Sequence, residues 1–317
     1  MIQLLISRLH QIRKSTGIVI VVYLLIGCGS SAEDSVAREP APISDRIVWQ
    51  LQDNENLPTG MQFYQGHKPG STSFSAWYIR LDANAPLALA PVRLSPAQTL
   101  DQIQLPGLMG AINGGYFGGS QPYSAAVYGE EVLSKNIAAL TRYNKSYPVM
   151  RALFWLDTEG RSDVGWIYHF GDQKTDIRHY SQPLPYQRNS DTPLPAPRSD
   201  EGEQLPALKM AIGGGPVLLK NGAVTLSYDE EIFWGSGVEL NDIRPRTAIG
   251  FTAQGEILLV VSNAMTLTEL PKHLLDLDIE GAINLDGGGS SALQVLETSV
   301  FNQFRPVPIA LTILQEE

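Results

Sequence analysis

A carboxylate, three glycines and two hydroxyls follow a short apolar segment near the C-terminal end of the chain. Residues 282–291 read Ala-Ile-Asn-Leu-Asp-Gly-Gly-Gly-Ser-Ser, with the carboxylate at Asp286. Glycine repeats add no side-chain packing and cost conformational entropy, and successive backbone amides in such a turn suit an anion. The segment therefore predicts a reactive carboxylate beside an anion-binding turn. A tight turn between strands, capped by Asp286, is the alternative.

Similar segments occur twice more in the chain. Residues 111–115 read Ala-Ile-Asn-Gly-Gly, and residues 211–215 read Ala-Ile-Gly-Gly-Gly. Glycines in such places let a ligand or another backbone approach closely. Three strands that end in similar turns are best explained if their ends line one cleft, so we expect the three glycine turns to lie together.

Two arginines supply positive charge before a further buried-looking strand. Arginine can hold a phosphate or carboxylate with two parallel hydrogen bonds. We assign Arg244 to a salt bridge with Glu239 or Asp242. Arg246 is assigned to the site because it directly precedes the apolar segment 247–250.

Alternating apolar residues and turn dipeptides predict strands over most of the chain. Hairpins are expected at 150–169 and 247–262, and Asn221-Gly222 is a strong hairpin signal. Helices are expected near 97–103 and between Thr268 and Asp278, where Pro271 would fall in the first turn. The sequence thus predicts an α+β fold in a single domain, with a mixed, largely antiparallel sheet and a few packed helices.

The N-terminal residues have the pattern of an export signal. Three cations precede an apolar segment, 17–26, that is short for a membrane span. Cys28 then follows in a sequence that resembles a bacterial lipobox, and it is the only cysteine, so it has no disulfide partner. We expect residues 1–27 to be cleaved, Cys28 to carry lipid with palmitate, and 28–45 to form a flexible tether. A membrane anchor with an incidental cysteine is the alternative.

The remainder, 46–317, fits one domain of roughly 270 residues. The formal net charge of −10 at pH 7 argues against nucleic acid as a partner, because binding along a phosphate backbone needs a basic surface. Residues 170–206 are polar and contain six prolines. We interpret this segment as a surface insertion, either a lid or a plain loop.

Four segments together resemble the phosphodiester glycosidases, and they occur in the order seen in that family. The segments are 113–117, 213–218, 246–250 and 284–291. Arg305-Pro306-Val307 is also similar to a C-terminal signature of the family. The resemblance covers residues 75–314, and the insertion has no obvious counterpart in it.

The resemblance implies hydrolysis of a sugar-1-phosphodiester at the anomeric C–O bond, in envelope glycoconjugates or exopolysaccharide. Such a hydrolase passes through an oxocarbenium-like transition state. Because phosphate is a weakly basic leaving group, a cation could replace the usual general acid. In this hypothesis Asp286 acts as nucleophile or base, Arg246 binds the phosphate, and Asn113 hydrogen-bonds the sugar or phosphate.

Further residues are predicted to bind the substrate through hydroxyls, backbone amides and one ring. Tyr116 would stack on the sugar, although core packing is the alternative for this aromatic side chain. The predicted binding residues are Thr247, Gly214, Gly215, Gly287, Gly288, Gly289, Ser290, Ser291 and Tyr116.

Other kinds of site have weaker support. Ala292 stands where a nucleophile elbow at Ser290 would need its last glycine, and the histidines lack zinc-ligand spacing. We expect no metal and no cofactor, while a divalent cation such as calcium stays open.

Two other functions remain possible on the same residues. One is a non-catalytic carbohydrate-binding envelope lipoprotein, and the other is a phosphodiesterase that cuts P–O. The expected partners are a phosphorylated glycan and, through Cys28, a membrane. The expected location is the bacterial envelope, lipid-anchored at the outer membrane and facing the periplasm.

Overall fold

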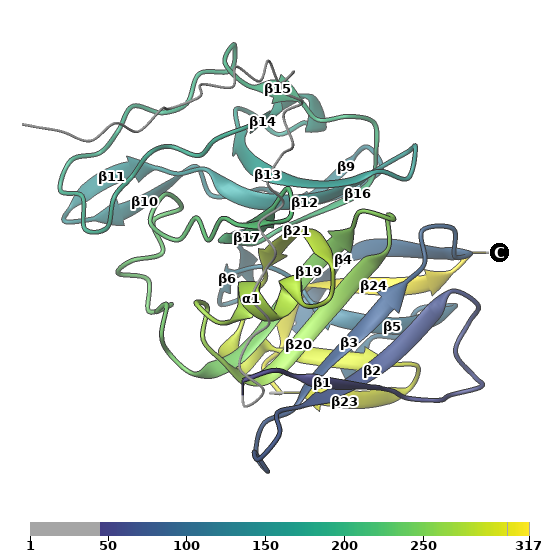
Figure 1. The fold of residues 1–317 in the computed structure, drawn as a ribbon. Helices are drawn as coiled ribbons and strands as arrows, with labels where there is room; N and C mark the ends of the chain where they lie inside the picture. Colours follow the sequence, from purple (N-terminus) through teal and green to yellow (C-terminus); the bar gives the residue numbers. More distant parts are fainter. Residues whose placement is uncertain (1–44, 303, 317) are drawn as a thin grey trace, which may run out of the picture. The chain divides into compact units, whose positions relative to one another are not determined.

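β-Strands in three large sheets account for most of the fold (Figure 1). The computed structural model describes residues 45–302 and 304–316, all within one compact unit. The predicted signal peptide, the lipidated Cys28 and almost all of the tether 28–45 therefore lie outside the described residues. Among the described residues, no helix has the length and apolar character needed to cross a bilayer.

The eight-stranded sheet runs from the first strand to the Asn-Gly hairpin, and all its pairings are antiparallel. In spatial order its strands are β1 (Val48–Leu51), β2 (Met61–His67), β3 (Ala76–Leu81), β20 (Ile257–Met265), β19 (Arg244–Thr252), β21 (Ile279–Asn284), β17 (Val217–Lys220) and β18 (Ala223–Val224).

The seven-stranded sheet is also antiparallel throughout. Its spatial order is β15 (Glu203–Gln204), β14 (Ile177–Tyr180), β13 (Ser162–His169), β12 (Arg151–Asp157), β16 (Leu208–Gly213), β8 (Ala126–Tyr128) and β9 (Glu131–Ser134). Its strands β14 and β15 come from the segment 170–206, so this insertion extends the sheet.

The five-stranded sheet is antiparallel as well. Its spatial order is β23 (Thr298–Asn302), β22 (Ala292–Val295), β5 (Leu108–Asn113), β24 (Val307–Gln315) and β4 (Leu87–Gln98). Two small hairpins complete the strands: β10 (Ala139–Arg142) with β11 (Lys145–Pro148), and β6 (Phe117–Gly118) with β7 (Gln121–Pro122). The short helices are α1 (Leu270–Leu275) and the single 3-10 turns η1 (Leu100–Gln102), η2 (Lys174–Asp176) and η3 (Gly288–Ser290).

One apolar core joins the three sheets. It contains Ile79 of the eight-stranded sheet, Phe154 of the seven-stranded sheet and Ile112 of the five-stranded sheet, and all three side chains are fully buried. Burying such side chains is the main favourable term in folding, so the three sheets depend on one another for stability.

The predicted α+β class is wrong. The described residues contain a single α-helix, and every pairing between their strands is antiparallel rather than mixed. The helix expected near 97–103 is reduced to η1, because β4 continues to Gln98 and pairs there with Val307 of β24. Tertiary pairing has overridden a local helix-start signal at Ser95-Pro96.

Several local predictions are confirmed. β12 pairs with β13, and β19 pairs with β20, as expected for the two hairpins. Asn221 and Gly222 both have positive φ, as the tight turn between β17 and β18 requires. The helix α1 lies inside the expected range, with Pro271 in its first turn.

Candidate functional site

The three glycine turns meet at the junction of the three sheets. β5, β16 and β21 belong to different sheets and end at Asn113, Gly213 and Asn284. The Asp286 amide donates to the Gly114 carbonyl at 3.2 Å, and the Gly215 amide donates to the Asn284 carbonyl at 2.7 Å. The convergence expected from the repeated Ala-Ile-glycine pattern is therefore present.

Two of the glycines are required by close contact between backbones. A Cβ on Gly115 would collide with the carbonyl of Gly213, and one on Gly214 would collide with the carbonyl of Asn284. The amide of Gly214 donates to Ala152 at 3.0 Å. Since the amide of Gly215 is also bonded, the predicted anion cradle does not receive free amides from this turn.

Asp286 is held firmly by its backbone while its carboxylate has few donors. Its carbonyl accepts a hydrogen bond from Asn113 Nδ2 at 2.7 Å, and its Oδ1 accepts the amide of Gly287 at 3.0 Å. Burial raises the pKa of the Asp286 carboxyl, and the Ser290 hydroxyl and the Arg305 charge oppose that rise. A carboxyl disfavoured as an ion by burial is typical of a reactive group.

The glycine triplet after Asp286 leaves two amides open. Within the described part of the chain, no acceptor bonds the amides of Gly288 and Gly289. Gly288 is half-buried with a φ of +59°, a conformation that glycine adopts without strain, and Gly289 is exposed. These two amides are the part of the predicted cradle that can still bind an anion.

Arg246 lies against this turn and is almost completely buried, at 2% exposure. Its Nε donates to the carbonyl of Met265 at 3.0 Å, and its Nη2 donates to those of Glu239 at 3.2 Å and Asp242 at 2.8 Å. A Cβ on Gly287 would lie 3.9 Å from Arg246 Cδ. The guanidinium is thus oriented by three carbonyls.

The Arg246 charge has no carboxylate partner among the described residues. Burial is the main cause that lowers the pKa of its guanidinium, to about 10. At neutral pH it is therefore still a cation, and its Nη1 has no acceptor within residues 45–302 and 304–316. Such a group can receive an anion.

Asn113 and Thr247 are fully buried and bond each other. Thr247 Oγ1 donates to Asn113 Oδ1 at 2.9 Å and lies 3.1 Å from Ser291 Oγ. The amide of Ala292 also donates to Asn113 Oδ1, at 3.1 Å. These side chains connect β5, β19 and the segment after Asp286, so in this structure they position the carboxylate from behind.

Tyr116 takes part in a second polar network. Its hydroxyl donates to the carbonyl of Gly215 at 2.8 Å and accepts from Asn284 Nδ2 at 2.7 Å. Its ring packs against Phe233 with centroids 5.3 Å apart. Burial and the nearby charge of Asp286 raise the pKa of the Tyr116 hydroxyl, which is therefore neutral.

Asn284 is a site residue that the sequence assignment missed. It ends β21 as Asn113 ends β5, and both asparagines follow the same Ala-Ile pair. That repeat is the signal that could have identified it. Its Nδ2 bonds the Gly215 carbonyl at 3.1 Å besides Tyr116, so it joins the second glycine turn to the third.

Two further arginines flank the open amides. Arg244 forms the expected ion pair with Asp242, and its Cδ lies 4.0 Å from where a Cβ on Gly288 would be. Arg305 Cδ lies 3.8 Å from the corresponding position on Gly289, and its Nη1 donates to Ser290 Oγ at 3.3 Å. Arg305 belongs to the C-terminal signature, but nothing in the sequence indicates its place beside the carboxylate.

A fully buried acid, Glu231, lies beneath the second glycine turn. A Cβ on Gly215 would collide with its Oε2, and the guanidinium of Arg151 stacks nearby on Phe233 at 3.9 Å. Burial raises the pKa of the Glu231 carboxyl, and the charge of Arg151 opposes that rise. No pattern in the sequence singled out either residue.

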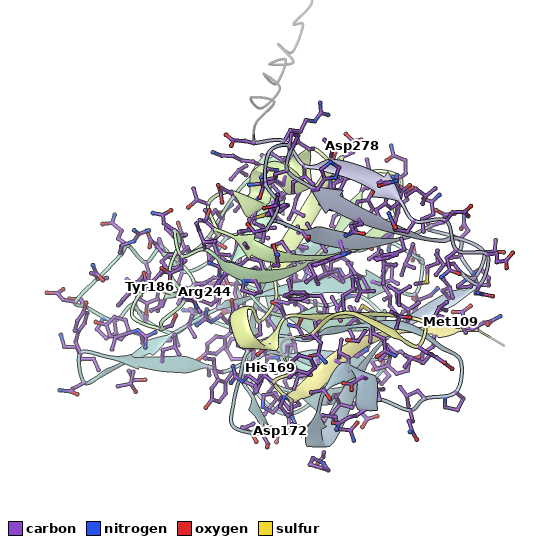
Figure 2. All side chains as sticks on the ribbon, turned by 90° about the horizontal axis from the view of Figure 1, so that it is seen from below. Met109, His169, Asp172, Tyr186, Arg244 and Asp278 are labelled. Carbon is purple, nitrogen blue, oxygen red and sulfur yellow. The ribbon has the colours of Figure 1, made fainter. Side chains whose placement is uncertain are left out.

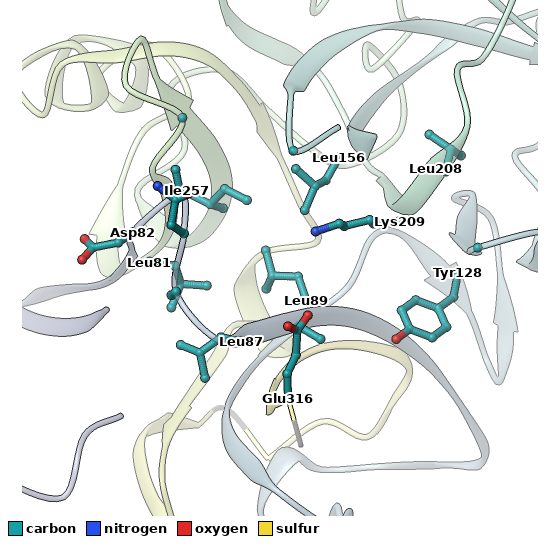
Figure 3. A pocket seen from close by; sticks show the side chains of 17 residues that line it. Leu81, Asp82, Leu87, Leu89, Tyr128, Leu156, Leu208, Lys209, Ile257 and Glu316 are labelled. Atoms are coloured by element: carbon teal, nitrogen blue, oxygen red, sulfur yellow. The ribbon is translucent and has the colours of Figure 1, made fainter. Parts of the chain in front are cut away.

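A cavity of about 610 Å³ is formed by other residues (Figure 3). Leucines from several strands line it, and Tyr128, Lys209 and Glu316 point toward it. None of the predicted site residues contributes to it. In the described part of the chain, no three His, Cys, Asp or Glu side chains gather as metal ligands.

Comparison with known proteins agrees with the resemblance drawn from the motifs. Residues 165–314 match the model of a family described as phosphodiester glycosidase, which confirms the resemblance there. No curated protein matches the chain by sequence.

Several solved structures share the fold. A hypothetical protein from Synechocystis is 18% identical with a TM-score of 0.51, over 81% of this chain and 62% of that one. The catalytic domain of zebrafish N-acetylglucosamine-1-phosphodiester alpha-N-acetylglucosaminidase, auto-inhibited by its pro-peptide, is 16% identical with a TM-score of 0.52, over 85% and 88%. A protein of Burkholderia pseudomallei described as exported is 15% identical with a TM-score of 0.52, over 76% and 74%. At these identities the likeness shows the fold alone.

Proposed function

We propose that this chain, whose residues 165–314 match the phosphodiester glycosidases, hydrolyses the anomeric C–O bond of a sugar-1-phosphodiester. One observation carries the proposal. The Asp286 carboxylate stands beside two open amides, and Arg246, Arg244 and Arg305 lie around the same turn. The arrangement pairs a nucleophile or base with a site for a departing anion.

In the proposed reaction the ionised Asp286 acts on the anomeric side of the bond. It either attacks the anomeric carbon directly or removes a proton from an attacking water. The C–O bond breaks, and its electron pair leaves with the phosphate as a phosphate monoester. Water supplies the hydroxyl that ends on the sugar.

Cations and backbone amides would bind the leaving phosphate. Arg246 has an oriented guanidinium whose Nη1 has no acceptor in the described part of the chain. The turn beside it carries the open amides of Gly288 and Gly289. Preorganised donors of this kind stabilise charge as it develops in the transition state. A phosphate monoester needs little protonation, so the scheme requires neither a general acid nor a metal.

The buried polar side chains would hold the carboxylate and the neighbouring turns in place. Asn113, Thr247 and Ser291 hold the Asp286 backbone from one side, and Asn284 with Tyr116 ties the neighbouring turn. Rigid support of this kind reduces the reorganisation needed at the moment of reaction. We assign these five side chains to positioning.

The substrate class and the setting extend the proposal. The zebrafish relative is named for an α-linked N-acetylglucosamine 1-phosphodiester, and we propose a related sugar-1-phosphodiester in an envelope glycoconjugate or exopolysaccharide. We also propose that Cys28 carries the lipid that anchors the chain at the outer membrane. Neither a metal nor another cofactor takes part in the proposed reaction.

Hydrolysis in ¹⁸O-labelled water tests the proposal. The probe is the methyl diester of N-acetylglucosamine α-1-phosphate, and Asp286→Asn is the control. We expect the label on the sugar hydroxyl, which reports C–O cleavage. Label on the phosphate would instead establish a phosphodiesterase, and glycan binding with no product from any phosphodiester would establish a binding protein.

A further inference from the structure

A second cavity, of about 450 Å³, lies next to the loop that orients Arg246. One wall is formed by Arg188 and Asn189, which belong to the proline-rich insertion 170–206. The other wall is formed by Tyr228, Trp234 and the loop 239–242. The insertion, for which the family resemblance offered no counterpart, therefore helps to form a cavity.

The loop 239–242 lines the cavity and also contacts a residue of the proposed site. Two carbonyls of this loop, at Glu239 and Asp242, accept the hydrogen bonds of Arg246 Nη2. The Asp242 carboxylate pairs with Arg244, whose Cδ approaches Gly288. The turn that carries Asp286 therefore contacts Arg246 and Arg244, and these two arginines in turn contact the loop that lines the cavity.

The insertion wall is fixed by contacts with the neighbouring hairpin β10–β11. Tyr147 donates its hydroxyl hydrogen to the carbonyl of Ser190 at 3.0 Å, and Lys145 Nζ donates to the carbonyl of Asp191 at 2.7 Å. Tyr186, which is labelled in Figure 2, also belongs to the insertion. Its ring packs on Tyr147 with ring centroids 5.8 Å apart. The wall is thus part of the folded structure.

The lining has donors, acceptors and aromatic rings in a small space. Arg188 bonds Asp229 at 2.9 Å and lies 5.3 Å from the Tyr228 ring, while the Glu239 side chain is exposed. Carboxylates at Glu239 and Asp242 disfavour a second phosphate. Amides, carboxylates and aromatic rings are suited to a neutral ligand rich in hydroxyls.

We propose that this cavity binds the aglycone of the phosphodiester, as a neutral hydroxyl-rich unit such as a sugar or alditol. This inference rests on the proposed function, which determines the part of the substrate that faces the cavity. In the substrate the phosphate lies between the sugar and the aglycone. In the protein the guanidinium groups lie between Asp286, which would act on the sugar, and the cavity, which would hold the aglycone. The insertion would then select which phosphodiesters this chain cleaves.

The test compares two diesters of N-acetylglucosamine α-1-phosphate, one with methanol and one with the 6-hydroxyl of methyl α-glucoside. We expect wild-type protein to favour the glucoside ester in kcat/KM. Arg188→Ala should lower this preference about tenfold, as loss of a charged hydrogen bond predicts. Arg198→Ala is the matched control, because Arg198 is an exposed arginine of the same insertion, paired with Asp200 and absent from the lining. An unchanged preference in Arg188→Ala would overturn the inference.

A binding measurement separates failure of this inference from failure of the proposed function. If neither diester is hydrolysed, methyl α-glucoside is titrated against the protein while tryptophan fluorescence is followed, since Trp234 lines the cavity. A saturating change that persists in Arg198→Ala and is lost in Arg188→Ala and Trp234→Phe supports a sugar-binding cavity. No change in wild-type protein rules it out.

Discussion

Two carboxylates near the second and third glycine turns show how burial alone differs from a reactive environment. Glu231 is fully buried and accepts four hydrogen bonds, from Ala152 N at 2.9 Å, Val217 N at 2.8 Å, Ser227 Oγ at 2.6 Å and Trp166 Nε1 at 3.1 Å. Asp286 is half-buried and receives the Gly287 amide and the Ser290 hydroxyl. Burial raises the pKa of both carboxyl groups.

The number of donors separates the two roles. An ionised carboxylate offers about four acceptor sites, and the protein fills them at Glu231. The Asp286 carboxylate can still accept further hydrogen bonds, and arginine side chains lie nearby. A raised pKa therefore does not identify the reactive acid, whereas an incomplete set of hydrogen bonds beside charged groups does.

Exchange of each acid for its amide should give opposite results. We expect Asp286→Asn to lose on the order of 10³-fold in kcat without any fall in its melting temperature. Glu231→Gln should instead destabilise the fold by about 3 kcal/mol, because an amide nitrogen would face donors. Rates on the methyl diester and thermal unfolding measure the two effects. A stable, inactive Glu231→Gln would reverse the assignment.

Arg246→Lys tests whether orientation of the guanidinium matters beyond its charge. Lysine cannot reproduce the planar set of bonds to Met265, Glu239 and Asp242. We expect kcat to fall about 100-fold. Arg244→Lys is the matched comparison, since Arg244 pairs with Asp242 at a half-buried surface position. An unchanged kcat in Arg246→Lys would show that charge alone is sufficient, and an equal loss in Arg244→Lys would show that the buried bonds of Arg246 have no special role.

The pH dependence follows from the raised pKa of Asp286. If the ionised form reacts, kcat/KM should rise with pH across a limb that lies above the ordinary Asp value of 3.8. Arg305→Ala removes a charge that lowers this pKa, so its limb should move to higher pH. Arg198→Ala should leave the limb unchanged, and an immobile limb in Arg305→Ala would contradict the assignment.

The same shift has a consequence for stability. A carboxyl with a raised pKa in the folded state favours folding below its unfolded pKa, and this contribution is lost as pH rises through the folded pKa. Asp286→Asn should therefore be more stable than wild type at neutral pH. Its advantage should disappear as pH falls below 3.8. Chemical denaturation at both pH values measures the difference.

The sequence was informative where local geometry decides the structure. Two-residue turns, alternation and the position of Pro271 predicted hairpins and α1, and the repeated glycine segments predicted that the three strand ends meet. It was misleading at 97–103, where pairing of β4 with β24 decided the outcome. A cap signal cannot report a strand more than 200 residues away.

The site was harder to predict because its contacts are not local. The sequence predicts open amides at Gly214 and Gly215, but these amides bond Ala152 and Asn284, which lie on other strands. Glu231 lies in no motif of the sequence, and Arg305 lies in a signature that does not indicate its contact with Ser290. Both residues acquire their places only from folding. Residue types could therefore indicate the chemistry, but the assignment of donors required the coordinates.

The smallest expected effects concern Tyr116, for which stacking on the sugar and positioning of the turn make different predictions. Tyr116→Phe keeps the ring but removes the hydroxyl that bonds Gly215 and Asn284, so it should cost about 1 kcal/mol of stability and lower kcat with KM unchanged. Tyr128→Phe, at an exposed tyrosine, should change neither. Tyr116→Leu removes the ring as well. If KM rises only in the leucine variant, the ring contacts the sugar, whereas equal KM values in both variants assign Tyr116 to positioning alone.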